Sequence, residues 1–179
     1  YIDENDAARA AKKEPSSGNN SSTNNSGNSQ QAPSNVNEVG WILDGNRWYY
    51  RYPDGTYLKN GWGFIGNIWY LFDANGMMLT GWQMKNGVYY YMNGDGKMQT
   101  GWLLYNNTWY YLSESGAMVT GWITLGDKAY YLGGDGGMLT GWQNIDGQIY
   151  YLYPDGHKAV NEVIDTFYLD QDGIWRKPQ

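Results

Sequence analysis

From residue 40 onward, short runs of aromatic and aliphatic residues alternate with Gly, Asn and Asp along the chain. In one stretch, Gly141-Trp142 opens a Trp-led segment, Asp146-Gly147 marks a turn and the aromatic segment Tyr150–Leu152 follows. Two β-prone runs around a turn of this kind predict a β-hairpin. A second turn pair follows the hairpin, here Asp155-Gly156, and a short linker leads to the next unit. The pattern therefore predicts a series of hairpins joined by short linkers.

The Gly-Trp pair recurs in a fixed register. It stands every 20 residues from Gly61-Trp62 to Gly141-Trp142, and Gly40-Trp41 precedes the first of these by 21 residues. A constant period of this length indicates a stack of small units rather than one globular core. Because an isolated hairpin is only marginally stable in water, each hairpin gains stability by stacking on its neighbours. We predict an all-β repeat solenoid of stacked β-hairpins with six repeats.

Both ends of the chain depart from the repeat. After the sixth repeat, Asn161-Glu162 replaces Gly-Trp and Phe167–Leu169 arrives early, which predicts a degenerate C-terminal cap and a repeat module spanning 40–179. Residues 1–39 begin with the helix-prone segment Ala7–Glu14 and continue in Ser, Asn and Gly, a composition that cannot bury enough apolar surface to fold. We expect a flexible linker there that tethers the repeats to another domain, with a disordered tail as the alternative.

Composition favours a binding surface over a catalytic one. Aromatic residues make up 17% of the chain, as much as charged residues do, yet only three are Phe. Trp and Tyr combine an apolar body with a polar group and favour half-exposed binding surfaces. No acid–base pair, activated nucleophile or phosphate loop is evident, and the single His157 follows a turn. We therefore expect this chain not to be an enzyme.

Charge and cysteine content narrow the partners further. The net charge of −6 argues against nucleic acid as a partner, despite the many rings that could stack on bases. The absence of Cys excludes disulfides and thiolate metal sites, and no other metal-ligand spacing stands out, so no metal or cofactor is expected. No apolar run reaches membrane-spanning length, so no transmembrane segment is expected either.

Aromatic residues hold fixed positions within each repeat. Counting from the Trp of Gly-Trp, position +8 is Tyr in all six repeats and position +16 is Met in four of them. Position +7 is a ring in the first four repeats, but Ala129 and Ile149 take its place in the last two. Neighbouring positions on a strand point to opposite faces. We expect one face to pack inward and the other to present its rings to the groove between hairpins.

Such ring clusters suit a cation that cannot donate hydrogen bonds. Several electron-rich rings with a Met thioether nearby favour a quaternary ammonium ion, each ring contributing about 0.5–2 kcal/mol. Three rings then make a site of roughly millimolar affinity. A weak site is useful when several copies act on a repetitive target, and the repeats supply the copies.

The motif GWxxxxxxWYYLxxxGxMxTGW, seen from Gly101 to Trp122, resembles the choline-binding (cell-wall-binding) repeats of pneumococcal and phage surface proteins. The resemblance implies a left-handed β-solenoid with choline as the ligand between successive repeats. It also implies phosphocholine on teichoic and lipoteichoic acids as the partner, and an extracellular location at the bacterial cell surface. A homodimer is compatible with the pattern.

The resemblance implies four choline sites, each with two rings from one repeat, a Tyr from the next and a nearby Met. The ring sets, numbered one to four, are Trp41, Trp48 and Tyr70; Trp62, Trp69 and Tyr90; Trp82, Tyr89 and Tyr110; and Trp102, Trp109 and Tyr130. The implied walls, not assigned to individual sites, are Met78, Met98, Met118 and Met138. The extra residue in Thr56–Asn60 is expected to distort the first site.

The pattern is incomplete in the last two repeats. Ala129 removes one ring beside Trp122, which weakens the case for a fifth site with Tyr150. No choline is expected at Trp142. The residues that take the ring and Met positions there are Ile149 and Lys158.

Two alternatives to a choline-binding anchor remain open. Related glucan-binding and clostridial toxin repeats also present aromatic platforms, so the array could be a carbohydrate-binding module. It could equally be the wall-targeting part of a larger hydrolase. The chain starts at Tyr1 rather than Met and shows no signal peptide, which we interpret as a processed protein or a fragment.

Overall fold

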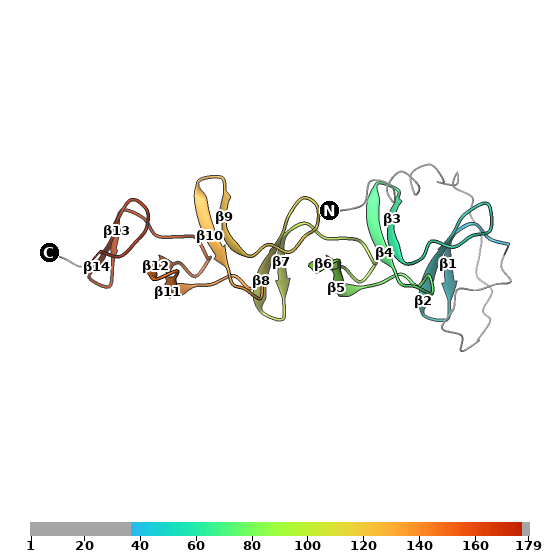
Figure 1. Cartoon of the computed structure of the whole chain (residues 1–179), viewed down its shortest axis with the longest axis horizontal. Coiled ribbons are helices and arrows are strands. Elements are labelled where there is room, and N and C mark those ends of the chain that lie inside the picture. Colours follow the sequence, from blue (N-terminus) through green and yellow to red (C-terminus); the bar gives the residue numbers. More distant parts are fainter. Residues whose placement is uncertain (1–36, 177–179) are drawn as a thin grey trace. The chain divides into compact units, whose positions relative to one another are not determined.

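The structure is a computed structural model that describes residues 37–176 (Figure 1). These residues form antiparallel two-stranded hairpins, as the sequence predicts. The strands are β1 (Gly40–Asp44), β2 (Arg47–Arg51), β3 (Gly61–Ile65), β4 (Ile68–Phe72), β5 (Gly81–Lys85), β6 (Val88–Met92), β7 (Gly101–Tyr105), β8 (Thr108–Leu112), β9 (Gly121–Leu125), β10 (Lys128–Leu132), β11 (Gly141–Ile145), β12 (Gln148–Leu152), β13 (Glu162–Ile164) and β14 (Phe167–Leu169). The expected helix-prone start and linker lie outside the described residues, apart from 37–39. Within 37–176 there is no helix long and apolar enough to cross a membrane.

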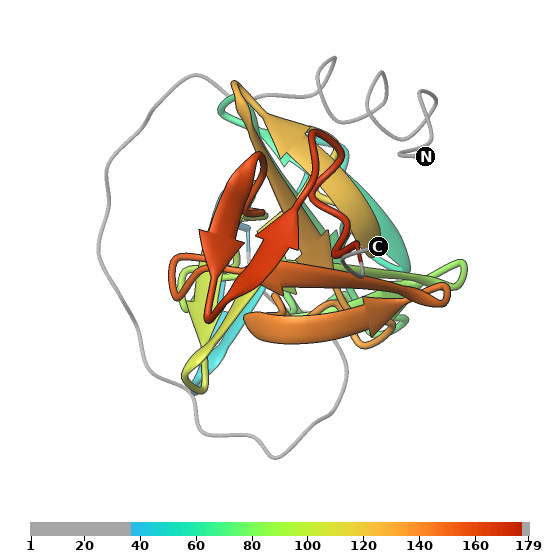
Figure 2. The ribbon, with the colours of Figure 1, turned by 90° about the vertical axis from the view of Figure 1, so that its left-hand side faces the viewer.

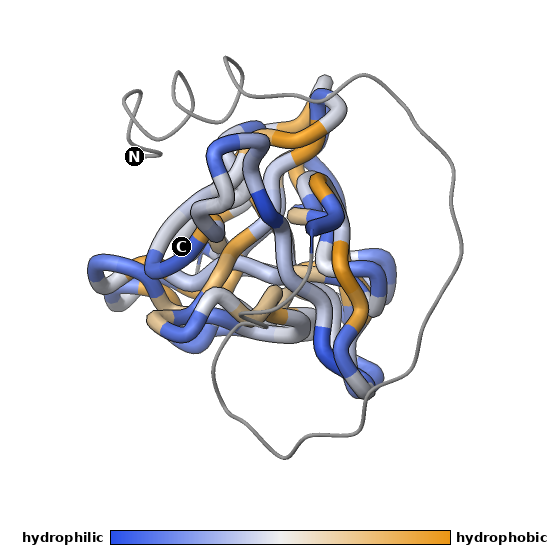
Figure 3. Tube along the Cα trace, turned by 90° about the vertical axis from the view of Figure 1, so that its right-hand side faces the viewer, coloured by the Kyte–Doolittle hydropathy of each residue, from blue (hydrophilic) through white to orange (hydrophobic). Residues whose placement is uncertain are grey.

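The hairpins group into two compact units. The first unit ends at Gln99 and holds the hairpins β1–β2, β3–β4 and β5–β6, and the second begins at Thr100 and holds the rest. Within the second unit, the hairpins β9–β10, β11–β12 and β13–β14 point in different directions around a common axis (Figure 2). The hydrophilic turns lie at the hairpin tips and the hydrophobic stretches lie in the strands (Figure 3).

The hairpin turns adopt the geometry that their residues favour. At Asn86 and Gly87 both φ angles are positive, 53° and 79°, and the same holds at Gly66-Asn67 and Asp146-Gly147. Two positive φ angles define a type I′ turn, whose twist matches the right-handed twist of the paired strands. Asn, Asp and Gly tolerate this region best, which is why these residues recur between the two strands.

After each hairpin, the second turn folds the chain back onto it. In the second repeat, Gly76 N–H donates to the carbonyl of Asp73 (3.1 Å), and the Asp73 carboxylate accepts from Met77 N–H (2.8 Å). Met78 then forms an isolated antiparallel bridge with Phe72. Equivalent bridges recur in the other repeats, so position +16 always lies beside the second strand of its own hairpin.

Within each unit, position +16 also joins a hairpin to the one before it. Its backbone N–H donates a hydrogen bond to the carbonyl of position +7 in the preceding repeat, at 2.7–2.9 Å. Within the two units these pairs are Met78 and Trp48, Met98 and Trp69, Met138 and Trp109, and Lys158 and Ala129, and in the shortened last repeat Trp175 makes the equivalent bond to Ile149. Hairpins are therefore connected by backbone as well as by side chains, whatever residue stands at +7 or +16.

In repeats two to six, the most deeply buried residue is the apolar one at position +10 on the second strand. These residues are at most 2% exposed: Phe72 and Met92 in the first unit, and Leu112, Leu132 and Leu152 in the second, with Leu169 at the matching place of the shortened C-terminal repeat. In the first unit Tyr50, Leu58 and Tyr70 pack around Phe72 as well. A core this narrow leaves most of the Trp and Tyr rings near the surface.

Candidate functional site

Strand pairing decides which rings of a hairpin share a face. In the first repeat, Trp41 pairs with Tyr50 and Leu43 with Trp48, so all four side chains lie on one face. Tyr49, at position +8, lies on the other face. The expected opposition of +7 and +8 is present, but both faces carry rings that meet a neighbouring hairpin. In the first unit, the hairpin of Trp62 thus contributes Trp62 and Trp69 to the junction after it and Tyr70 to the junction before it.

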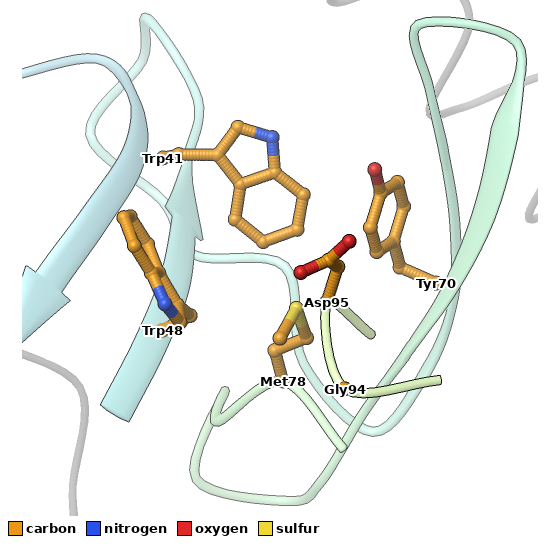
Figure 4. Close-up of a pocket in the computed structure, with 6 residues that line it drawn as sticks. All are labelled: Trp41, Trp48, Tyr70, Met78, Gly94 and Asp95. Carbon is orange, nitrogen blue, oxygen red and sulfur yellow. The ribbon is translucent and has the colours of Figure 1, made fainter. Parts of the chain in front are cut away.

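The first predicted ring set comes together as expected. The ring centroids of Trp41 and Trp48 are 6.3 Å apart at 86°, and those of Trp41 and Tyr70 are 4.7 Å apart at 65°. With Met78, these rings surround a cavity of about 310 Å³ (Figure 4). The side chain of Trp48 is 41% exposed, so the cavity opens to solvent.

Asp95 also lines this cavity, and sequence reasoning missed it as a site residue. It lies beside Gly94 in the turn after β6, which belongs to the repeat two steps beyond Trp41 (Figure 4). Its carboxylate is 3.8 Å from the Lys97 ammonium at the surface. Burial raises the pKa of Tyr70, and the negative charge of Asp95 raises it further. The phenol therefore stays neutral while Asp95 adds negative charge at the cavity, which favours a cationic ligand.

The second predicted set has the same geometry as the first. Trp62 and Trp69 are 6.2 Å apart at 86°, and Trp62 and Tyr90 are 4.8 Å apart at 74°. The expected distortion of the first set is therefore wrong. The extra residue lies in the linker before Gly61, where Asn60 adopts a positive φ of 54° and absorbs it without displacing the rings.

The rings of the second set are less exposed to solvent than those of the first set. Trp62 is only 3% exposed. Phe64 packs on Trp69, with ring centroids 4.9 Å apart. In the first, third and fourth repeats the residue at the Phe64 position is an exposed Leu or Met. Phe64 therefore screens one ring of this set from solvent.

Among the first, second and fourth sets, the fourth has the most exposed pair of Trp side chains. Trp102 and Trp109 are 6.2 Å apart at 87°, and Trp102 and Tyr130 are 5.1 Å apart at 71°. The two Trp side chains are 36% and 42% exposed. The third set takes Trp82 and Tyr89 from the first unit and Tyr110 from the second, so it stays a prediction.

The structure shows which Met lies beside which ring set, a question that the sequence left open. Met78 lies with Trp41 and Trp48, and its N–H bonds to the Trp48 carbonyl. The same bond places Met98 at the second set and Met138 at the fourth. The Met beside a site therefore comes from the repeat after its two Trp residues.

A glycine of the following repeat leaves space for the side chains of Met78, Met118 and Met138. A Cβ on Gly96 would lie 2.2 Å from the Sδ of Met78, and one on Gly156 would lie 2.2 Å from the Sδ of Met138. A Cβ on Gly136 would come within 2.5 Å of the Sδ of Met118. These glycines, recognised from sequence only as turn residues, also leave space for the Met side chains.

At the fifth junction a lysine takes the place of Met. Trp122 and Tyr150 keep the usual contact, 4.9 Å apart at 66°, and Ala129 leaves the third side without a ring. The Lys158 ammonium lies 5.1 Å from the Trp122 centroid and 5.7 Å from the Tyr150 centroid. The association of Lys158 with Trp142 suggested by the sequence is therefore wrong, because position +16 contacts the preceding repeat.

The sixth junction is filled by further rings. Phe167 stands where the other repeats have Tyr at +8, 5.6 Å from Trp142. Trp175 occupies the Met position, 5.8 Å from Phe167, and its backbone N–H donates to the carbonyl of Ile149. In residues 37–176, no three His, Cys, Asp or Glu side chains cluster as metal ligands would.

The repeats match known family profiles. The profile of the choline-binding repeat matches residues 79–120, 100–140 and 119–162. A profile for a cell wall binding repeat matches residues 39–57 and 60–78. Together the two profiles account for the repeats from 39 to 162. Among curated proteins none matches the chain.

Solved structures of bacterial and phage proteins share this architecture. Choline binding protein F from Streptococcus pneumoniae is 42% identical over 78% of this chain and 47% of its own, with a TM-score of 0.75. CbpJ from the same species is 42% identical over 78% of this chain and 48% of its own, with the same TM-score. A pneumococcal cell wall endolysin from phage Cp-1, complexed with choline, is 32% identical over 75% of this chain and 40% of its own, with a TM-score of 0.50. This chain thus spans about half the length of the first two relatives. On these matches and the repeated hairpins, the chain belongs to the choline-binding repeat family.

Proposed function

We propose that the aromatic sets between successive hairpins bind the choline groups of teichoic and lipoteichoic acids and hold the protein at the bacterial cell surface. The observation that carries this proposal is the cavity formed by Trp41, Trp48, Tyr70 and Met78. Its three rings come from two hairpins, so a bound cation would also hold the two hairpins together.

The lining of this cavity favours a quaternary ammonium ion over a sugar. Stacked rings serve both ligands, but a sugar also needs several hydrogen-bond partners for its hydroxyl groups. Beside the rings, the described lining consists of a Met thioether, a Gly and the carboxylate of Asp95. A thioether and a single negative charge suit a methylated cation, which interacts through electrostatics and dispersion and donates no N–H hydrogen bond.

The repetition of the site provides the affinity that one site lacks. A single cage of three rings reaches roughly millimolar affinity. When several cages engage a polymer with many choline groups, later binding events become intramolecular and the overall affinity rises by orders of magnitude. The first, second and fourth sets share nearly identical ring distances, as repeated binding of one ligand requires.

The repeats act as a binding module, and any catalytic function belongs to a segment outside this chain. We propose that residues 1–39 tether the module, residues 40–179, to such a segment, which could be a wall hydrolase or an adhesin. The endolysin complexed with choline supports the first arrangement, because that protein is multimodular.

Choline titration tests the proposal directly. A ligand that binds only the folded state raises the melting temperature, so choline should raise it and change Trp fluorescence. Ethanolamine, which carries a primary ammonium, serves as the matched control and should act more weakly, and glucans or galactosides should have no effect. The absence of any response at tens of millimolar choline would rule out the proposal. A response to sugars instead would favour the carbohydrate-binding alternative.

A further inference from the structure

We propose that the Lys158 ammonium is the built-in occupant of the fifth aromatic site, formed by Trp122, Ala129 and Tyr150. Its Nζ lies 5.1 Å and 5.7 Å from the centroids of the Trp122 and Tyr150 rings. Both distances are within the range of a cation–π interaction. This inference rests on the proposed function, since it takes the fifth junction as a choline site that the chain fills itself.

The backbone places Lys158 where the other sites have Met. Its N–H donates to the carbonyl of Ala129 (2.8 Å), as that of Met138 donates to Trp109 (2.7 Å). The Lys158 stem also packs as Met does, because a Cβ on Gly173 would lie 2.9 Å from its Cδ. The longer side chain then carries an ammonium ion to the rings, where Met ends in a thioether.

The hydrogen bond of Lys158 matches a primary ammonium. Ala129 supplies no ring at this junction, and the Lys158 Nζ donates to the carbonyl of Asp172 (2.7 Å). A quaternary ammonium ion has no N–H to make this bond. The fifth junction thus keeps two rings of the cage and adds a hydrogen-bond acceptor that a primary ammonium can use and a quaternary ammonium cannot.

Self-occupancy has two consequences. The fifth junction is excluded from the set of choline sites, and its contact between hairpins exists without ligand. The fourth junction, with Trp102 and Trp109 more than a third exposed, has no internal cation among the described contacts, although the Trp102–Tyr130 contact and the Met138–Trp109 backbone bond already join its hairpins. The second unit therefore combines a junction whose rings hold an internal ammonium with one whose rings are open to a ligand.

The test uses the full chain and compares Lys158→Met with Lys59→Met, which makes the same change at an exposed lysine. Without choline, the Lys158 variant should melt about 2–4 °C lower than the Lys59 variant. The ε-methylene protons of Lys158 lie beside two rings, so wild-type protein should show an upfield-shifted lysine resonance that the Lys158 variant lacks. Equal melting temperatures or an unshifted resonance would overturn the proposal.

Choline then tests the closure itself. Saturating choline should leave the upfield-shifted Lys158 resonance unchanged. If the resonance moves to the ordinary lysine position, choline displaces the ammonium and the proposal is overturned. The double variant Ala129→Trp/Lys158→Met rebuilds a cage and should bind one more choline per chain than wild type; an unchanged number would contradict the assignment. If no variant binds choline, the proposed function fails, while the ligand-free melting and resonance data still decide whether Lys158 closes the junction.

Discussion

The backbone N–H of Met138 donates a 2.7 Å hydrogen bond to the carbonyl of Trp109, one repeat earlier. This bond places the Met thioether beside a Trp that is 42% exposed. The same backbone contact recurs at junctions with other side chains, including Lys158 to Ala129. The repeat therefore supplies a constant frame, and the residues at +7 and +16 decide what each junction can bind.

Removal of the Trp109 ring should weaken the fourth site selectively. Trp109→Ala deletes one wall of an open cage, so choline affinity there should fall about 2- to 30-fold. Isothermal titration of the full chain with choline provides the measurement. Ile149→Ala is the control, because Ile149 stands at the same position of a junction filled by Phe167 and Trp175. Equal losses in the two variants would contradict the site assignment.

Gly156→Ala should damage the fourth site beyond its effect on folding. Gly156 has a φ of 87°, and a new Cβ would lie 2.2 Å from the Met138 Sδ. The matched change Gly126→Ala also falls at a positive φ, 64°, but meets nothing within 4 Å. Each change should cost about 1–2 kcal/mol of stability from the backbone alone, measured by denaturant unfolding. Because the Met side chain can move, only the Gly156 variant should also weaken choline binding; loss in both variants would point to a general effect of unfolding.

Asp95→Asn should lower choline affinity at the first site. The carboxylate is exposed, so its attraction for a cation is modest and screened by salt. The expected loss is roughly two- to fivefold at low salt and smaller at high salt, measured by Trp fluorescence. Asp127→Asn serves as the control, because this exposed turn carboxylate does not line the cavity. A salt-independent loss would show that Asp95 acts through the turn conformation and not through its charge.

Alkaline pH should destabilise the ring junctions. Burial raises the pKa of Tyr70 above its ordinary value near 10, with Asp95 adding to the shift, and burial also raises the pKa of Tyr90. The folded state then holds these protons more tightly than the unfolded state. The stability they contribute is complete below about pH 10 and is lost as the pH rises through the folded pKa. Urea unfolding at pH 8–11 measures this loss, and the double variant Tyr70→Phe/Tyr90→Phe should show a shallower decline. An identical decline would assign the effect to other groups.

Local patterns account for much of what could be predicted. The Asn-Gly and Asp-Gly pairs favour positive φ angles, which predicts the hairpin turns. Side chains alternate between the two faces of each strand, and this arrangement recurs with the 20-residue period. The proximity of the rings in three of the sets therefore follows from residues with a fixed spacing. The core residues at +10, such as Leu112 and Leu132, also recur with the period of the repeat. The sequence does not single them out as the core, because other apolar strand residues such as Leu104 recur in the same way and are exposed.

Contacts that cross from one repeat to another needed the tertiary structure. Met78 lies beside Trp41 and Trp48 of the previous repeat, and Asp95 lines the same cavity from the turn two repeats further on. Spacing within one repeat indicates neither contact. The sequence shows that Lys158 replaces a Met, but not that its ammonium lies between Trp122 and Tyr150. By itself the sequence determined the hairpin, its turns and the periodic supply of rings, because these depend on local backbone preferences. The tertiary structure decided which junctions hold an open cage and which are closed, because that depends on how side chains from successive hairpins meet in space.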